Sequence, residues 1–152
     1  MIKILFVCHG NICRSPMAEA LMKYYSKEYG IDKFVYTESM ATSSEELGND
    51  IYPPVKRVLD NHRIPYERHR ARKISGNALN EWDLIICMDE YNLRNLKHLL
   101  GESNKIHKLP EFSGSNVDVD DPWYTREFEE CFQEISIHIK NLCLKVLNKI
   151  QQ

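Results

Sequence analysis

The sequence has no excess of charge of either sign and no long apolar run. Its 20 Lys and Arg residues nearly balance its 22 Asp and Glu residues, so the formal net charge at pH 7 is −2. A protein recruited to nucleic acid or anionic lipid by bulk charge carries a clear basic excess. A transmembrane helix needs about 20 consecutive apolar residues. The composition therefore predicts neither a nucleic-acid partner nor membrane insertion.

The sequence also lacks the paired cysteines of a zinc site or a disulfide scaffold. Its five cysteines are an odd number, spread as Cys8, Cys13, Cys87, Cys131 and Cys143. The amino terminus has one lysine and only a short apolar run, unlike a secretory leader. We therefore expect a cytoplasmic location, reduced thiols and no zinc site, with at least one cysteine available for chemistry.

Strand and helix patterns alternate along the 152 residues, without repeats or a linker. Apolar runs predict strands at 2–8, 34–40, 83–88 and 106–109. Helices are predicted from Ser15-Pro16, from Pro53, and after Met88 to about Leu100 with a stop at Gly101. A loop over 110–124 is followed by a final long helix. The alternation predicts an α/β fold in a single domain, residues 1–152.

A cysteine and an arginine six positions apart lie directly after the first predicted strand. Open α/β sheets bind ligands at this edge, and loop amides with a helix start form a cradle for a tetrahedral dianion. The cradle's positive field favours the thiolate of Cys8, and the planar fork of Arg14 can hold two phosphoryl oxygens. Gly10 permits the tight backbone. The alternative is a buried structural thiol with a surface arginine nearby.

The segment Val7 to Pro16 resembles the active-site loop of the low-molecular-weight protein tyrosine phosphatases. The resemblance covers most of the chain, through Asp121-Pro122-Trp123-Tyr124, His69-x-Ala71-Arg72 and Cys87-Met88-Asp89-Glu90. It implies a central four-stranded parallel sheet with helices on both faces. It also implies no metal, no cofactor, and a phosphate-binding loop made of His9, Gly10, Asn11, Ile12, Cys13, Arg14 and Ser15.

The resemblance implies hydrolysis of phosphotyrosine and small aryl phosphates through a cysteinyl-phosphate on Cys8. Asp121 matches the family's general acid, which protonates the leaving oxygen and then acts as the base on water. Without the loop, the carboxylates Asp118, Asp120 and Asp121 would suit a solvated turn. Carboxylates gathered in this way are expected to raise one another's pKa.

Four further residues match family positions that support the loop. Ser15 matches a hydroxyl that hydrogen-bonds the thiolate, and it also fits an ordinary helix N-cap. Asn11, Ser39 and His69 match a hydrogen-bonded network, although His69 fits a solvent-facing position equally well. Cys13 fits two interpretations: a disulfide with Cys8 that protects the nucleophile, or simple apolar packing.

Four residues are expected to line the substrate pocket. Trp123 and Tyr124 suit an aromatic wall for a phenyl ring, one of them also serving as core packing. Ile12 resembles the phosphotyrosine type, whereas the related arginine phosphatases carry threonine. Glu45 at the rim would disfavour acidic phosphopeptides. Tyr124 could itself be a phosphorylation site.

Two other functions use the same features. An arsenate reductase on this scaffold needs a cysteine relay, but Cys87 stands alone and Cys131 is distant in sequence. A non-catalytic phosphotyrosine-binding module would have no need for Cys8, Arg14 and Asp121 together. The expected partners are phosphotyrosine proteins and an opposing tyrosine kinase, and the expected state is a monomer.

Overall fold

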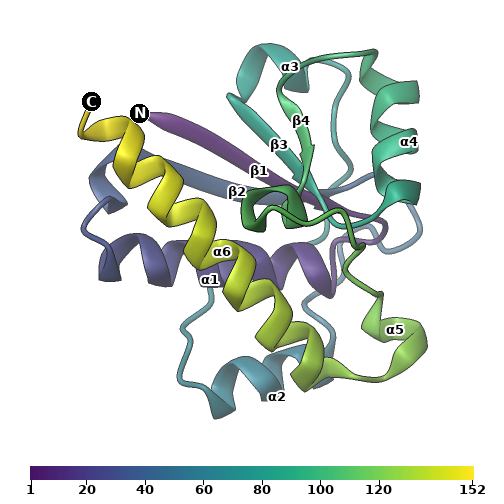
Figure 1. The fold of residues 1–152 in the computed structure, drawn as a ribbon. Helices are drawn as coiled ribbons and strands as arrows, with labels where there is room; N and C mark the ends of the chain where they lie inside the picture. Colours follow the sequence, from purple (N-terminus) through teal and green to yellow (C-terminus); the bar gives the residue numbers. More distant parts are fainter.

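Four parallel strands form the centre of the protein in the order β2-β1-β3-β4. The computed structural model describes residues 1–152 (Figure 1). The strands are β1 (Ile2–Cys8), β2 (Val35–Ala41), β3 (Leu84–Cys87) and β4 (Ile106–Lys108). Cys8 pairs with Ala41, and Cys87 pairs with Lys108, so the carboxyl ends of all four strands lie along one edge.

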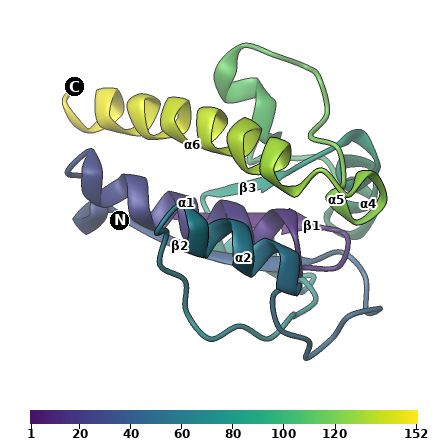
Figure 2. The same ribbon diagram turned by 90° about the horizontal axis from the view of Figure 1, so that it is seen from below.

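Helices cover both faces of this sheet. They are α1 (Arg14–Glu28), α2 (Pro53–Asn61), α3 (Ala78–Glu81), α4 (Glu90–Leu100), α5 (Pro122–Thr125) and α6 (Phe128–Ile150), with 3-10 turns η1 (Asp32–Phe34) and η2 (Leu109–Ser113). The helices α1, α2 and α6 pack on one face, and α3 and α4 lie on the other (Figures 1 and 2). The predicted fold class is confirmed. No helix is long and apolar enough to cross a membrane.

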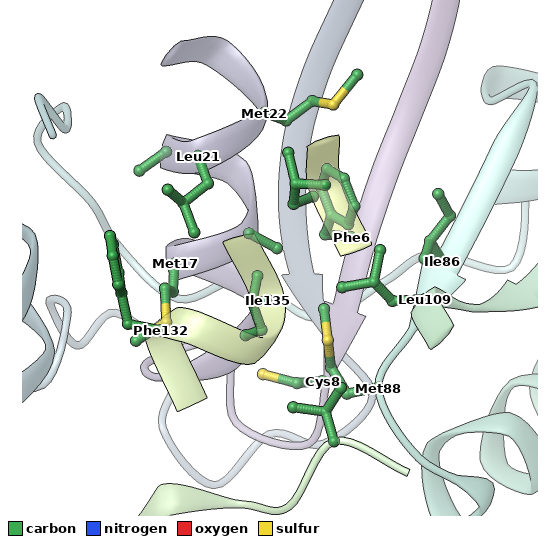
Figure 3. Packing of buried hydrophobic residues seen from close by; sticks show 14 of the residues in the cluster. Phe6, Cys8, Met17, Leu21, Met22, Ile86, Met88, Leu109, Phe132 and Ile135 are labelled. Carbon is green, nitrogen blue, oxygen red and sulfur yellow. The ribbon is translucent and has the colours of Figure 1, made fainter. Parts of the chain in front are cut away.

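The central strand β1 contributes side chains to two hydrophobic cores of unequal size, one on each face of the sheet. Ile4 and Phe6 belong to a cluster of 28 buried residues under α1 and α6, whereas Leu5 and Val7 belong to a cluster of nine under α3 and α4. Successive strand side chains point to opposite faces, so a strand buried on both faces is apolar throughout. In the larger cluster Phe6 lies behind α6, and Cys8 lies at the end of the strand (Figure 3).

Three local expectations were wrong. Strand β2 ends at Ala41, one residue later than predicted. The expected loop over 110–124 contains most of η2 and α5, both too short to show a helical period. Helix α1 begins at Arg14 with Cys13 as the N-cap, so Ser15 is not the cap. Its hydroxyl has another partner, because the loop turns it toward the sulfur of Cys8.

Candidate active site

The loop between β1 and α1 surrounds the sulfur of Cys8. The Sγ atom accepts a hydrogen bond from the backbone N–H of Asn11 at 3.3 Å and lies 3.0 Å from Ser15 Oγ. Cys8 is 3% exposed, at the carboxyl edge of the sheet. The sulfur thus lies between a loop N–H and a hydroxyl, in the turn that leads into α1.

Asn11 holds the loop in shape. Its φ of 61° lies in the left-handed region, which asparagine tolerates better than most residues. Its Nδ2 donates to Ser15 Oγ at 2.8 Å and to Ser39 Oγ at 3.0 Å, and its Oδ1 accepts from the Arg72 N–H at 3.2 Å. The Asn11 carbonyl lies 2.6 Å from His69 Nε2. His69 therefore contacts the loop, and its side chain is not simply solvent-facing.

Arg14 is the most constrained cation of the site, with a side chain 3% exposed. Its Nη1 donates to Asp89 Oδ2 and to the Val119 carbonyl, both at 2.7 Å, and its Nη2 donates to Asp121 Oδ2 at 3.4 Å. A guanidinium has five N–H donors, so the Nε donor and one Nη2 donor have no acceptor in the protein. Burial lowers the pKa of Arg14, but the charges of Cys8, Asp89 and Asp121 raise it by more, so the net pKa of Arg14 is raised.

The segment carrying Asp121 is fastened by a buried lysine. Lys108, 4% exposed, lies 2.8 Å from Asp118 and 3.2 Å from Glu90. Asp121 Oδ1 caps α5 by accepting from the Trp123 N–H at 3.0 Å. Burial raises the pKa of Asp118, but the hydrogen bond from Lys108, a backbone hydrogen bond from Glu90 and the charges of Lys108 and Arg14 together outweigh burial, so the net pKa is lowered. The expected mutual rise among these carboxylates is therefore wrong for Asp118.

An aromatic group lies beside the segment that carries Asp121. Trp123 is 41% exposed and Tyr124 is 79% exposed, so neither is core packing, contrary to expectation. The ring of Tyr52 lies 4.8 Å from that of Trp123, and the guanidinium of Arg126 lies 5.5 Å above Tyr52. These contacts hold Trp123 from behind and leave Tyr124 free.

The other predicted pocket residues lie in different surroundings. Ile12 is buried within the larger core, at the base of the loop. Glu45 is exposed and lies 2.9 Å from His9 Nε2. This pair neutralises a rim carboxylate whenever His9 is protonated.

All five thiols are unpaired and buried. Burial, and then the neighbouring Cys8, raises the pKa of Cys13 far above its usual range. Burial is also the largest cause that raises the pKa values of Cys87, Cys131 and Cys143 to about 12. The expectation that these last three are core residues is confirmed.

Sequence reasoning missed Asp89 and Lys108 as parts of the site. Asp89 follows the third strand directly, so its position at the carboxyl edge of the sheet was the available clue. Lys108 gave no such clue, because a lysine ending a three-residue strand reads as a surface residue. No group of three or more His, Cys, Asp or Glu side chains gathers as a metal site.

A buried cysteine whose sulfur contacts a backbone N–H and a hydroxyl of its loop, with a buried arginine in the same loop at the carboxyl edge of a parallel sheet, defines a cysteine-dependent phosphatase. A family model described as "Low molecular weight phosphotyrosine protein phosphatase" matches residues 3–152, and the chain belongs to that family. It is thus an enzyme whose substrates are phosphoproteins.

Individual relatives agree. The chain is 35% identical to "Low molecular weight protein-tyrosine-phosphatase YfkJ" of Bacillus subtilis, covering 100% of this chain and 97% of the relative. The crystal structure of YfkJ superposes with a TM-score of 0.92 at 34% identity, covering 100% and 98% of the two chains. PtpA of Staphylococcus epidermidis is 36% identical over 93% of this chain and 92% of its own. The phosphatase SP-PTP of Streptococcus pyogenes has a TM-score of 0.83 at 36% identity, covering 95% and 93%.

Proposed function

We propose that the protein hydrolyses phosphotyrosine and small aryl phosphates through a covalent intermediate on Cys8. The observation that carries this proposal is the pair of free N–H donors on Arg14, in a loop whose Asn11 N–H donates to the Cys8 sulfur. Two donors of one guanidinium can bind two phosphoryl oxygens at once. The Asp89 and Val119 contacts fix that guanidinium before the substrate arrives.

The reaction has two steps. The Cys8 thiolate attacks phosphorus, and the bond to the tyrosyl oxygen breaks as Asp121 gives that oxygen a proton. Water then attacks the cysteinyl-phosphate, Asp121 takes its proton, and the sulfur–phosphorus bond breaks to return the thiolate. Ser15, 3.0 Å from the sulfur, stabilises the thiolate as the leaving group.

The mouth of the site favours an aromatic substrate. Trp123 and Tyr124 offer exposed rings next to the acid, and Tyr52 supports Trp123. A phenyl ring stacked there carries its phosphate down to Cys8, whereas the shorter phosphoserine gains no ring contact. The exposed carboxylate of Glu45 disfavours peptides with acidic residues near the phosphotyrosine.

The test measures phosphate release from phosphotyrosine, phosphoserine and phosphoarginine peptides in excess EDTA and reductant. We expect turnover of phosphotyrosine that vanishes in Cys8→Ser and falls at least 100-fold in Asp121→Asn, since general acid catalysis contributes roughly 10²–10⁴-fold. Folded wild-type protein that releases no phosphate from any peptide would refute the proposal.

An arsenate reductase would need a second accessible thiol. Cys87 is fully buried, and burial raises its pKa to about 12, so it is a poor relay nucleophile. The protection of Cys8 by Cys13 also stays a proposal, and the buried Cys13 thiol needs the loop to open before it can react.

The cellular setting is part of the same proposal. A monomer in the cytoplasm, working against a tyrosine kinase and without nucleic acid or membrane insertion, is supported by the balanced charge and the five free thiols. No cofactor enters either step of the reaction.

A further inference from the structure

A cleft of about 800 Å³ opens along β2, the edge strand of the sheet. Residues of α1 and of the segment 65–72, which follows α2, form its walls. None of the residues from Cys8 to Ser15 lines it, so this cleft is separate from the proposed active site. Its volume is typical of small-molecule sites, which span about 300–1,000 Å³.

The cleft has an excess of cations that no carboxylate neutralises. Lys27, Arg68 and Arg70 line it and have no ion-pair partner, against one unpaired carboxylate, that of Asp32. Arg72 pairs with Glu38, and Lys23 is shared by Glu19 and Glu67, so one further negative charge remains. The five cations and four carboxylates that line the cleft leave one net positive charge. The unpaired charges therefore favour an anion.

One buried hydroxyl in the cleft has no hydrogen-bond partner. Thr37 on β2 is 5% exposed, lines the cleft, and its Oγ1 contacts no polar atom of the protein. Buried polar groups are nearly always paired, so an orphan of this kind marks a place where a ligand atom or water completes the site. The hydroxyl can donate to an anionic oxygen.

The walls of the cleft are also the supports of the phosphate-binding loop. Ser39 accepts from Asn11 Nδ2 and donates to Glu19 Oε1 at 2.6 Å. His69 Nε2 lies 2.6 Å from the Asn11 carbonyl, and the Arg72 N–H donates to Asn11 Oδ1. All four supports line the cleft, so a ligand there touches the residues that fix Asn11.

The geometry points to a second site, in which a small polyvalent organic anion, a carboxylate or a phosphate, binds in this cleft. The anion joins Arg68 and Arg70 to Lys27 on α1 and bonds the Thr37 hydroxyl. It thereby clamps the segment 65–72 against α1 and strengthens the hold on Asn11. Binding raises turnover at Cys8, and this second part rests on the proposed phosphatase reaction.

Binding is tested in phosphate-free buffer, and binding of a probe at the Cys8 site is recognised separately as competitive inhibition of p-nitrophenyl phosphate hydrolysis. The probes are citrate for the carboxylate and glycerol 3-phosphate for the phosphate, with ionic strength matched by NaCl, and titration calorimetry and thermal melting as readouts. We expect at least one probe to bind wild type and Arg94→Glu, a control on α4, and to lose at least tenfold in affinity in Arg68→Glu/Arg70→Glu. Equal binding by the double variant, or binding of neither probe to wild type, would overturn the site.

The variant Thr37→Val distinguishes binding at a specific site from non-specific attraction of anions by the basic side chains. Valine keeps the shape and removes only the hydroxyl, so the ligand-free protein should melt no lower than wild type while the probe binds several-fold more weakly. Undiminished binding by this variant contradicts a role for Thr37 in the site. The probe that binds should also raise kcat/KM on an aryl phosphate at least twofold.

The two proposals fail differently. Binding without any change in kcat/KM overturns the coupling to Asn11 and leaves the phosphatase reaction intact. Binding by a folded protein that releases no phosphate overturns the proposed function and leaves the site intact.

Discussion

Replacing Asp89 by asparagine tests whether a carboxylate outside the loop positions Arg14. Asp89 Oδ2 accepts from Arg14 Nη1 at 2.7 Å, while its Oδ1 caps α4 by accepting from the Asn92 N–H. Asparagine is as good an N-cap as aspartate. The substitution Asp89→Asn therefore removes the charge opposite Arg14 and leaves the helix cap in place.

The size of the effect follows from the burial of the pair. Removing one partner of a fully buried pair costs about 3–5 kcal/mol, but the Asp89 side chain is 20% exposed and Arg14 keeps Asp121 and Val119. A charged hydrogen bond contributes about 1.5–3 kcal/mol, so we take about 2 kcal/mol for the loss. Expressed entirely in the transition state, this lowers kcat/KM roughly 30-fold.

The assay compares kcat/KM on p-nitrophenyl phosphate, the inhibition constant of inorganic phosphate, and the urea unfolding free energy. Asp89→Asn should weaken phosphate inhibition together with kcat/KM, since both depend on Arg14. Asp89→Ala should lose about 1 kcal/mol more stability through the cap, and Glu102→Gln, an exposed carboxylate elsewhere, should change neither constant. If Asp89→Asn stays within twofold of wild type in both constants, Asp89 does not position Arg14.

Three further results are expected. Asn11→Gly keeps the left-handed backbone, so it should fold better than Asn11→Ala, yet both should lose most activity with the amide network; equal stabilities would contradict the backbone argument. Lys108→Met should lower kcat more than it changes KM by freeing the acid segment. The folded state lowers the pKa of Asp118, so ionised Asp118 stabilises the fold above about pH 4. This stabilisation is lost as the pH falls through the lowered pKa. In Lys108→Met, urea titrations should no longer show this loss of unfolding free energy in acid. Burial lowers the pKa of His138, so the folded protein favours its neutral form and loses stability as pH falls below about 6.5; His138→Gln should flatten that slope in melting curves.

The bounds of strands and helices could be predicted from the sequence where a single local pattern determines them. The strand Ile2–Cys8 has the predicted bounds, and α4 ends at Leu100 because Gly101 adopts a positive φ of 86°. The site residues that lie on the loop between β1 and α1 could be predicted, because they are adjacent in sequence. Asp89 and Lys108 were missed because their roles come from pairing with residues distant in sequence. The Ser15 cap was misassigned because a serine before a proline is also the usual helix start.

The two hydrophobic cores differ in size, so the two faces of the sheet should unfold locally at different temperatures. The face held by nine buried residues, under α3 and α4, has far less apolar area to lose than the face with 28. Amide hydrogens of α4 should therefore exchange with solvent through partial openings that leave the amides of α1 and β1 protected.

Such an opening would detach Asp89 from Arg14, since Asp89 is the first anchor of α4. Cys8 would keep its place in the larger core and Arg14 would keep Val119 and Asp121, so phosphate binding would weaken while the nucleophile stayed in position. Heat should therefore lower the activity of this enzyme reversibly some degrees before it denatures.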